Sequence, residues 1–164
     1  MRRYALPIAV IFIAGALQGN LPAWLVFKGA RPDVVLVALI AMALTLDPLS
    51  GAIIGFVAGT VHGTIVGYSL GSFIISRTII GFLAGSVTFR LFTENPVVPV
   101  LCAGGLTFLG EAVFLLANPM PDLLAVLNIV LAKSLYSSLL TLLAFWFLRW
   151  IEVRRKIKKA EARL

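Results

Sequence analysis

Residues 51–71 read GAIIGFVAGTVHGTIVGYSLG, with a glycine at every fourth position from Gly51 to Gly71. In water, each glycine inside a helix costs about 0.5–1 kcal/mol relative to alanine. In lipid the backbone has no other hydrogen-bond partner, so such a segment still forms a helix. Glycine at a spacing of four leaves one side of that helix smooth, and a second helix can approach it closely. The run therefore predicts a membrane helix that acts as a packing surface.

The composition of the chain agrees with a membrane protein. Hydrophobic residues make up 60% of the 164 residues and charged residues 13%, and the mean hydropathy is +1.03. Soluble domains are about half apolar and a quarter charged. The net charge of +7 gathers at the two ends of the chain beside apolar segments, where it indicates topology and predicts no nucleic-acid partner. The single cysteine, Cys102, excludes a disulfide within the chain.

Six apolar segments predict an all-α, six-helix transmembrane bundle over residues 1–151, followed by a basic tail over 152–164. The segments cover residues 4–27, 33–46, 49–68, 71–92, 97–117 and 123–151. The second segment is short, since about 20 residues are needed to cross a bilayer. Most breaks carry turn signals such as Asp47-Pro48 and Asn95-Pro96. The break near Ser69 is weak and predicts a tight turn between the third and fourth segments.

Charge asymmetry predicts the orientation of this bundle. With six spans, both termini lie on one side together with ten basic residues, and only Lys28 and Arg31 lie on the other. The positive-inside rule then places both termini in the cytoplasm. The tail residues Arg154, Arg155, Lys156, Lys158 and Lys159 suit an anionic membrane surface or a cytoplasmic partner, although a simple stop-transfer cluster accounts for them equally well.

Four ionisable residues are predicted to lie at membrane depth: His62, Arg77, Glu111 and Lys133. Such residues are costly in lipid and often functional. One hypothesis is a polar cluster that binds a ligand or a partner. The favoured alternative is that Glu111 pairs with Arg77 or Lys133 and holds the last three segments in register.

The residues near His62 along the chain, Thr60, Gly63 and Thr64, supply no carboxylate, so we expect a neutral histidine that hydrogen-bonds between helices. The sequence has no paired nucleophile and base, no zinc-binding HExxH motif and no phosphate-binding loop. We therefore expect no enzymatic activity, no cofactor and no metal.

Two groups of residues resemble a known family. Arg31-Pro32-Asp33 open the second segment, and Gly51-Ala-Ile-Ile-Gly-Phe-Val-Ala-Gly59 leads through Gly67-Tyr-Ser-Leu-Gly71 to Gly81-Phe-Leu-Ala-Gly85. This order resembles the rod shape-determining MreD family over about Arg31–Gly85. His62 stands where that family usually has an aspartate.

The resemblance implies a fold similar to the substrate-binding S components of ECF vitamin transporters. It also implies a non-enzymatic role in the bacterial cell-elongation complex of the inner membrane, which regulates peptidoglycan synthesis and cell shape. The implied partners are an MreC-like protein and, through it, MreB, RodA and a class B penicillin-binding protein. The alternatives are an S component that binds a vitamin, and a binder or flippase of a lipid intermediate in which Arg77 or Lys133 faces a phosphate.

The glycine stripe, defined as Gly51, Gly55, Gly59 and Gly63, is the first candidate for helix packing or for a partner interface. We expect leucine at Gly55 or Gly59 to disrupt packing and alanine to be tolerated.

Overall fold

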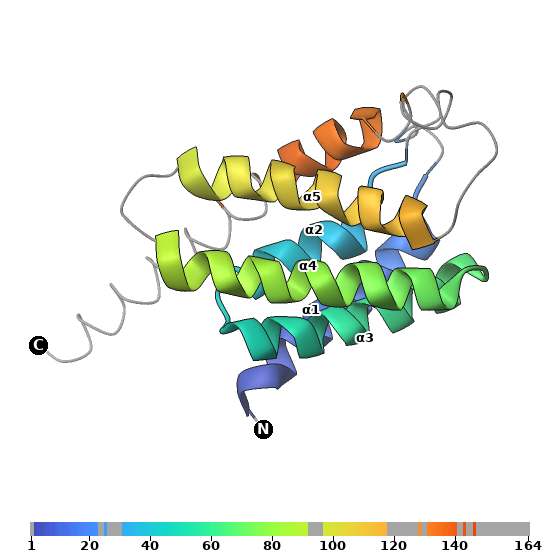
Figure 1. Ribbon diagram of the computed structural model, residues 1–164. Helices are drawn as coiled ribbons and strands as arrows, with labels where there is room; N and C mark the ends of the chain where they lie inside the picture. The colour runs from blue at the N-terminus through green and yellow to red at the C-terminus, as the bar shows by residue number, and fades with distance from the viewer. Residues whose placement is uncertain are drawn as a thin grey trace, which may run out of the picture.

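The computed structural model describes residues 2–22, 25, 31–91, 97–117, 128, 131–140, 143 and 146. Within these residues all regular structure is helical, which confirms the predicted all-α class (Figure 1). The labelled helices are α1 (Arg2–Gly19), α2 (Val34–Ala43), α3 (Pro48–Val66), α4 (Leu70–Leu91) and α5 (Val97–Ala117). Residues 131–140, in the predicted sixth segment, are helical as well. The basic tail, residues 152–164, lies outside the described residues.

Local sequence explains the α3–α4 hairpin. The Asp47 side chain accepts a hydrogen bond from the backbone of Ser50 and caps α3, and Pro48 occupies the first turn, where no backbone N–H is needed. The helix ends at Gly67, whose φ of 79° suits glycine. Ser69 also has a positive φ, of 51°, and α4 begins at the next residue. The predicted tight turn is therefore confirmed.

The first predicted segment is too long. The sequence suggested a helix to Phe27, but α1 ends at Gly19, and the Asn20 side chain donates a hydrogen bond to the carbonyl of Ala16 in its last turn. Of the remaining predicted residues, only 20–22 and 25 are described, and they lie outside α1. The prediction ran too far because the residues after Gly19 remain mostly apolar, whereas Asn20 and Pro22 follow the end of the helix.

Helix α2 is the centre of the bundle. It has ten residues, about 15 Å at 1.5 Å per residue, or half the thickness of a bilayer core. Val35, Leu36, Leu39, Ile40 and Ala43 are all fully buried, and Figure 1 shows α2 behind α4 in the middle of the molecule. A helix apolar on all sides belongs in such a position. The predicted segment 33–46 is thus only partly helical.

The glycine stripe packs against α4 of the same chain. A Cβ atom at Gly55 would lie 2.9 Å from the Cα atom of Thr78, and one at Gly59 would lie 2.5 Å from that of Ile74. At the ends of the contact, Gly51 meets Gly81 and Gly63 meets Leu70. Because α4 covers these positions, the stripe is a helix-packing surface within the chain, which was one of the two expectations, and it is not open to a partner. The last two glycines of the repeat, Gly67 and Gly71, have no such neighbour.

The same distances correct the expectation that alanine would be tolerated in the stripe. Real Cβ atoms are almost never found closer than 3.0 Å to such neighbours, and the atoms in the way are backbone atoms of α4, which cannot move aside alone. One added methyl group must push the two helices apart. The period-four pattern predicted a close helix contact, but it did not reveal how little space remains in it.

Two described helices are long and apolar enough to cross a membrane, namely Pro48–Val66 and Leu70–Val87. Shorter apolar helices cover Tyr4–Gly19, Val34–Ala43 and Gly104–Ala117.

Candidate functional site

The centre of the site is Asp33, which ends a non-helical segment and caps α2. Its Oδ1 accepts a hydrogen bond of 2.8 Å from the backbone of Leu36. The flanking backbone is held from two other helices. Gln18 of α1 accepts from Val34 N at 2.7 Å and donates to the Pro32 carbonyl at 3.2 Å, and Ser137 Oγ accepts from Asp33 N at 3.3 Å. These contacts bring the Asp33 carboxylate, which is fully buried, into the interior of the bundle.

Three helices direct basic groups at this carboxylate. Arg77 of α4 donates a hydrogen bond of 2.5 Å from Nη2 to Asp33 Oδ2. Lys133 Nζ lies 3.6 Å from the same oxygen, and His62 Nδ1 of α3 lies 3.5 Å from Oδ1. A carboxylate in a low-dielectric interior requires such compensation. Asp33 therefore links the start of α2 to α3, α4 and the segment 131–140.

Glu111 of α5 supplies a second carboxylate. Its Oε1 and Oε2 lie 3.0 and 3.1 Å from Lys133 Nζ, and Oε1 lies 3.7 Å from Arg77 Nη2. We name Asp33, His62, Arg77, Glu111 and Lys133 the ionic cluster. Its two carboxylates balance its two basic side chains, so the net charge is zero when His62 is neutral. Charge balance is what allows such a group to stay inside a helical bundle.

The structure brings together all four ionisable residues that the sequence placed at depth. Glu111 contacts both Arg77 and Lys133, so it links α4, α5 and the helical segment 131–140. The closest partner of Arg77, however, is Asp33, which the sequence analysis treated only as a motif residue. Its position before an apolar helix was the available signal, because an aspartate at a helix start is a typical N-cap.

His62 has a carboxylate neighbour after all. The sequence offered none within a few residues, but Asp33, 29 positions earlier, lies 3.5 Å away in space. The imidazole is 4% exposed and packs on Phe73, with 4.4 Å between the ring centroids. Phe73 in turn packs on Phe114 of α5 at 4.6 Å. An aromatic layer thus covers one side of the ionic cluster.

Further contacts fix the orientation of Arg77. Its Nη1 donates to Ser76 Oγ at 3.1 Å, and that hydroxyl donates to the Gly110 carbonyl at 2.6 Å. The guanidinium carbon lies 5.5 Å from the centre of the Phe73 ring, within cation–π range. Arg77 is fully buried. It therefore cannot face the phosphate of a lipid, and of the two residues named for the lipid-binding alternative only Lys133 is partly exposed.

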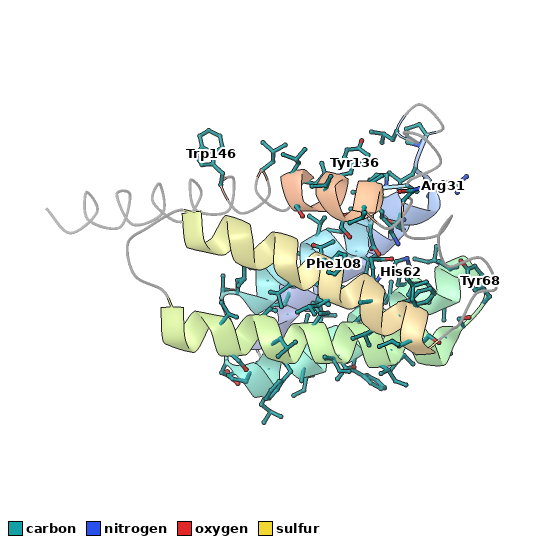
Figure 2. All side chains as sticks on the ribbon, turned by 45° about the horizontal axis from the view of Figure 1, so that its top comes forward. Arg31, His62, Tyr68, Phe108, Tyr136 and Trp146 are labelled. Carbon is teal, nitrogen blue, oxygen red and sulfur yellow. The ribbon has the colours of Figure 1, made fainter. Side chains whose placement is uncertain are left out.

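Not every residue of the Arg31-Pro32-Asp33 motif enters the cluster. Pro32 is buried, but Arg31 is exposed. Figure 2 shows Arg31, His62 and Tyr68 toward one end of the bundle and Trp146 toward the other. Among the residues that the structure describes, no three histidine, cysteine, aspartate or glutamate side chains group as a metal site requires.

The ionic cluster suits a structural or binding role. Each charged member already faces a group of opposite charge, and the cluster joins α2, α3, α4, α5 and the segment 131–140. Comparison of the chain with protein-family models, with curated proteins and with solved structures gives no match in any of the three.

Proposed function

We propose that this chain is a multi-pass protein of the bacterial inner membrane, with both termini in the cytoplasm, and a non-enzymatic subunit of the cell-elongation complex. In this proposal it partners an MreC-like protein and regulates peptidoglycan synthesis and cell shape. The observation that carries it is the arrangement of the family-like motifs. Asp33, the last residue of the first motif, accepts a hydrogen bond from Arg77 of α4. The glycines of the second motif hold α3 and α4 in close contact on either side of Arg77.

The outer surface supports the membrane location. Large apolar side chains are exposed on several helices, among them Phe12 of α1, Phe56 of α3, Phe82 of α4 and Leu116 of α5, which are 58, 54, 49 and 82% exposed. Soluble monomers rarely expose large contiguous apolar patches, and large apolar side chains exposed on four helices are compatible with lipid around the bundle. A lipid environment accounts for this exposure without a further partner.

Exposed hydroxyl groups support the same location. Thr60 donates to the carbonyl of Phe56, Thr64 to that of Thr60, and Ser86 to that of Phe82, all four residues back on the same helix. In water these hydroxyls would have solvent as a partner. In lipid the helix itself is the partner at hand.

The proposed partner contact lies outside the glycine stripe, since α4 occupies it. Exposed apolar faces of the bundle are the candidate surfaces for a single-span protein. The basic sequence Arg154–Lys159 is the candidate contact for its cytoplasmic segment. Transmembrane association depends on close packing rather than on a hydrophobic driving force, so a partner helix must fit one of these faces in shape.

Two experiments test the function. Affinity purification of the tagged protein in mild detergent should recover an MreC-like protein, and depletion in a rod-shaped host should give round cells. Depletion with normal cell shape, together with tight binding of a vitamin by the pure protein, would replace the proposal with the S-component alternative.

A further inference from the structure

Several buried polar atoms in and beside the ionic cluster have no hydrogen-bond partner. Among the described residues these include His62 Nδ1 and Arg77 Nε within the cluster, and Ser134 Oγ of the residue next to Lys133. Glu111 Oε1 also accepts no hydrogen bond, although it lies 3.0 Å from Lys133 Nζ in their ion pair. Their residues are at most 5% exposed. An unsatisfied buried group costs about 1–3 kcal/mol, so native proteins rarely leave several together. The usual remedy at a buried polar site is ordered water.

One edge of the cluster is open. The Lys133 side chain is 24% exposed, whereas the side chains of the other four members are between 0 and 5% exposed. The helical segment around Lys133 is polar on its inner side. Ser137 Oγ accepts from Asp33 N, and Ser134 is 5% exposed. Leu135, Leu139 and Leu143 of the same segment are more than 60% exposed.

The chemistry of the orphan atoms limits what can fill the site. Arg77 Nε–H is a donor, Glu111 Oε1 is an acceptor, and the Ser134 hydroxyl is both. The cluster is already neutral, so an added anion or cation would leave an uncompensated charge, and a metal cation would also face Arg77 and Lys133. The ligand must be small and neutral, and it must both donate and accept hydrogen bonds.

We propose that the ionic cluster is hydrated, with water entering beside Lys133 and bound at Ser134 and Glu111. The proposed water lies where Glu111 of α5 meets Lys133 of the segment 131–140, in an otherwise apolar bundle. This inference rests on the membrane location given under the proposed function. With lipid on the outer face of the segment, Ser134 on the inner side would contact water and Leu135 on the outer side would not.

Cysteine labelling tests this hydration in the full-length protein in membranes. In a Cys102→Ala background, Ser134→Cys is compared with Leu135→Cys, its neighbour, which is 69% exposed on the outer apolar face. The reagent is sulfonatoethyl methanethiosulfonate, a membrane-impermeant anion, supplied to both sides of permeabilised membranes. A thiol first loses its proton to water, and the thiolate then displaces methanesulfinate to form a mixed disulfide. Thiols in lipid do not ionise and stay unmodified.

We expect Ser134→Cys to react at least about tenfold faster than Leu135→Cys. Equal and slow reaction of both would overturn the hydration. Orientation is read separately from Tyr68→Cys in the exposed α3–α4 turn, with reagent on one side only. Labelling of Tyr68→Cys from the cytoplasm would contradict the proposed topology and leave the comparison of Ser134 with Leu135 valid.

A second measurement does not depend on a variant that folds. A crystal structure of the unsubstituted protein that resolves ordered solvent should show water within hydrogen-bond distance of Ser134 Oγ. A direct hydrogen bond from Ser134 Oγ to another protein group, with no water beside Glu111, would overturn the proposal.

Discussion

Arg77 Nη2 donates a hydrogen bond of 2.5 Å to Asp33 Oδ2, although 44 residues separate the two in the chain. Both side chains are fully buried. This contact fixes the non-helical start of α2 against the middle of α4. Each side chain compensates the charge of the other, so neither can be neutralised alone without leaving a buried charge.

Neutralising Asp33 should therefore destabilise the protein strongly. We expect Asp33→Asn to lower the free energy of unfolding by about 3 kcal/mol, because Arg77 keeps its charge and loses its nearest counter-charge. Thermal unfolding in detergent, followed by circular dichroism, measures the effect. Arg31→Gln, an exposed neighbour in the same motif, should change the midpoint little. Equal effects of the two variants would contradict the central role of Asp33.

The contact between the glycine stripe and α4 should not accept alanine. Gly55→Ala places a methyl group 2.9 Å from Thr78 Cα, and overpacking of this kind costs about 1–3 kcal/mol. Gly71→Ala is the matched control, since it lies in the same repeat with nothing within 4 Å of its Cβ position. The melting temperature of Gly55→Ala should fall clearly below that of Gly71→Ala. A stable Gly55→Ala protein would mean that the helices lie farther apart than described.

The pair formed by Glu111 and Lys133 should be coupled. Lys133 Nζ lies within 3.1 Å of both Glu111 oxygens, whereas Arg77 Nη2 lies 3.7 Å from the nearer one. In a double-mutant cycle with Glu111→Gln and Lys133→Met, we expect a coupling energy of about 1 kcal/mol or more. The cycle of Glu111→Gln with Arg77→Gln should give a smaller value. Additive effects in both cycles would argue against an ion pair at Glu111.

Gln18 should stabilise the start of α2 through both ends of its amide. It accepts from Val34 N and donates to the Pro32 carbonyl, and each hydrogen bond contributes about 0.5–1.5 kcal/mol. We expect Gln18→Leu to lower the free energy of unfolding by about 1–3 kcal/mol. The stability of Gln18→Glu should lie between those of Gln18→Leu and the unsubstituted protein, since glutamate keeps only the acceptor. Hydrogen exchange at Val34 reports the loss locally. Unchanged exchange there in Gln18→Leu would contradict this role.

The proposed topology rests on the distribution of basic residues and is most sensitive to the short length of α2. Reporter fusions at both termini should report the cytoplasm, because the basic residues favour that side by ten to two. In the proposed topology the segment around α2 crosses the membrane with only ten helical residues, which requires other helices to enclose its non-helical part. A C-terminal reporter active only on the outer side would show that this segment does not cross.

The sequence by itself determined the all-helical class, the α3–α4 hairpin and the close packing of its glycines. The signals for these features lie close together in the chain: a cap at Asp47, a left-handed glycine at Gly67 and a glycine repeat of four along a single helix. Local propensity and periodicity report such features directly. The sequence also identified most of the buried charges, because an ionisable residue in an apolar segment is conspicuous wherever it points.

Only the tertiary structure decided what those features contact. It placed α4 on the glycine stripe and enclosed α2 within the bundle. It also made Asp33 the partner of Arg77, Lys133 and His62, which lie between 29 and 100 positions away in the chain. No local pattern records such a pairing, since it depends on how five helical segments pack together. The physical reason is that a buried charge takes whichever counter-charge lies nearest in space, and distance along the chain does not enter the Coulomb energy.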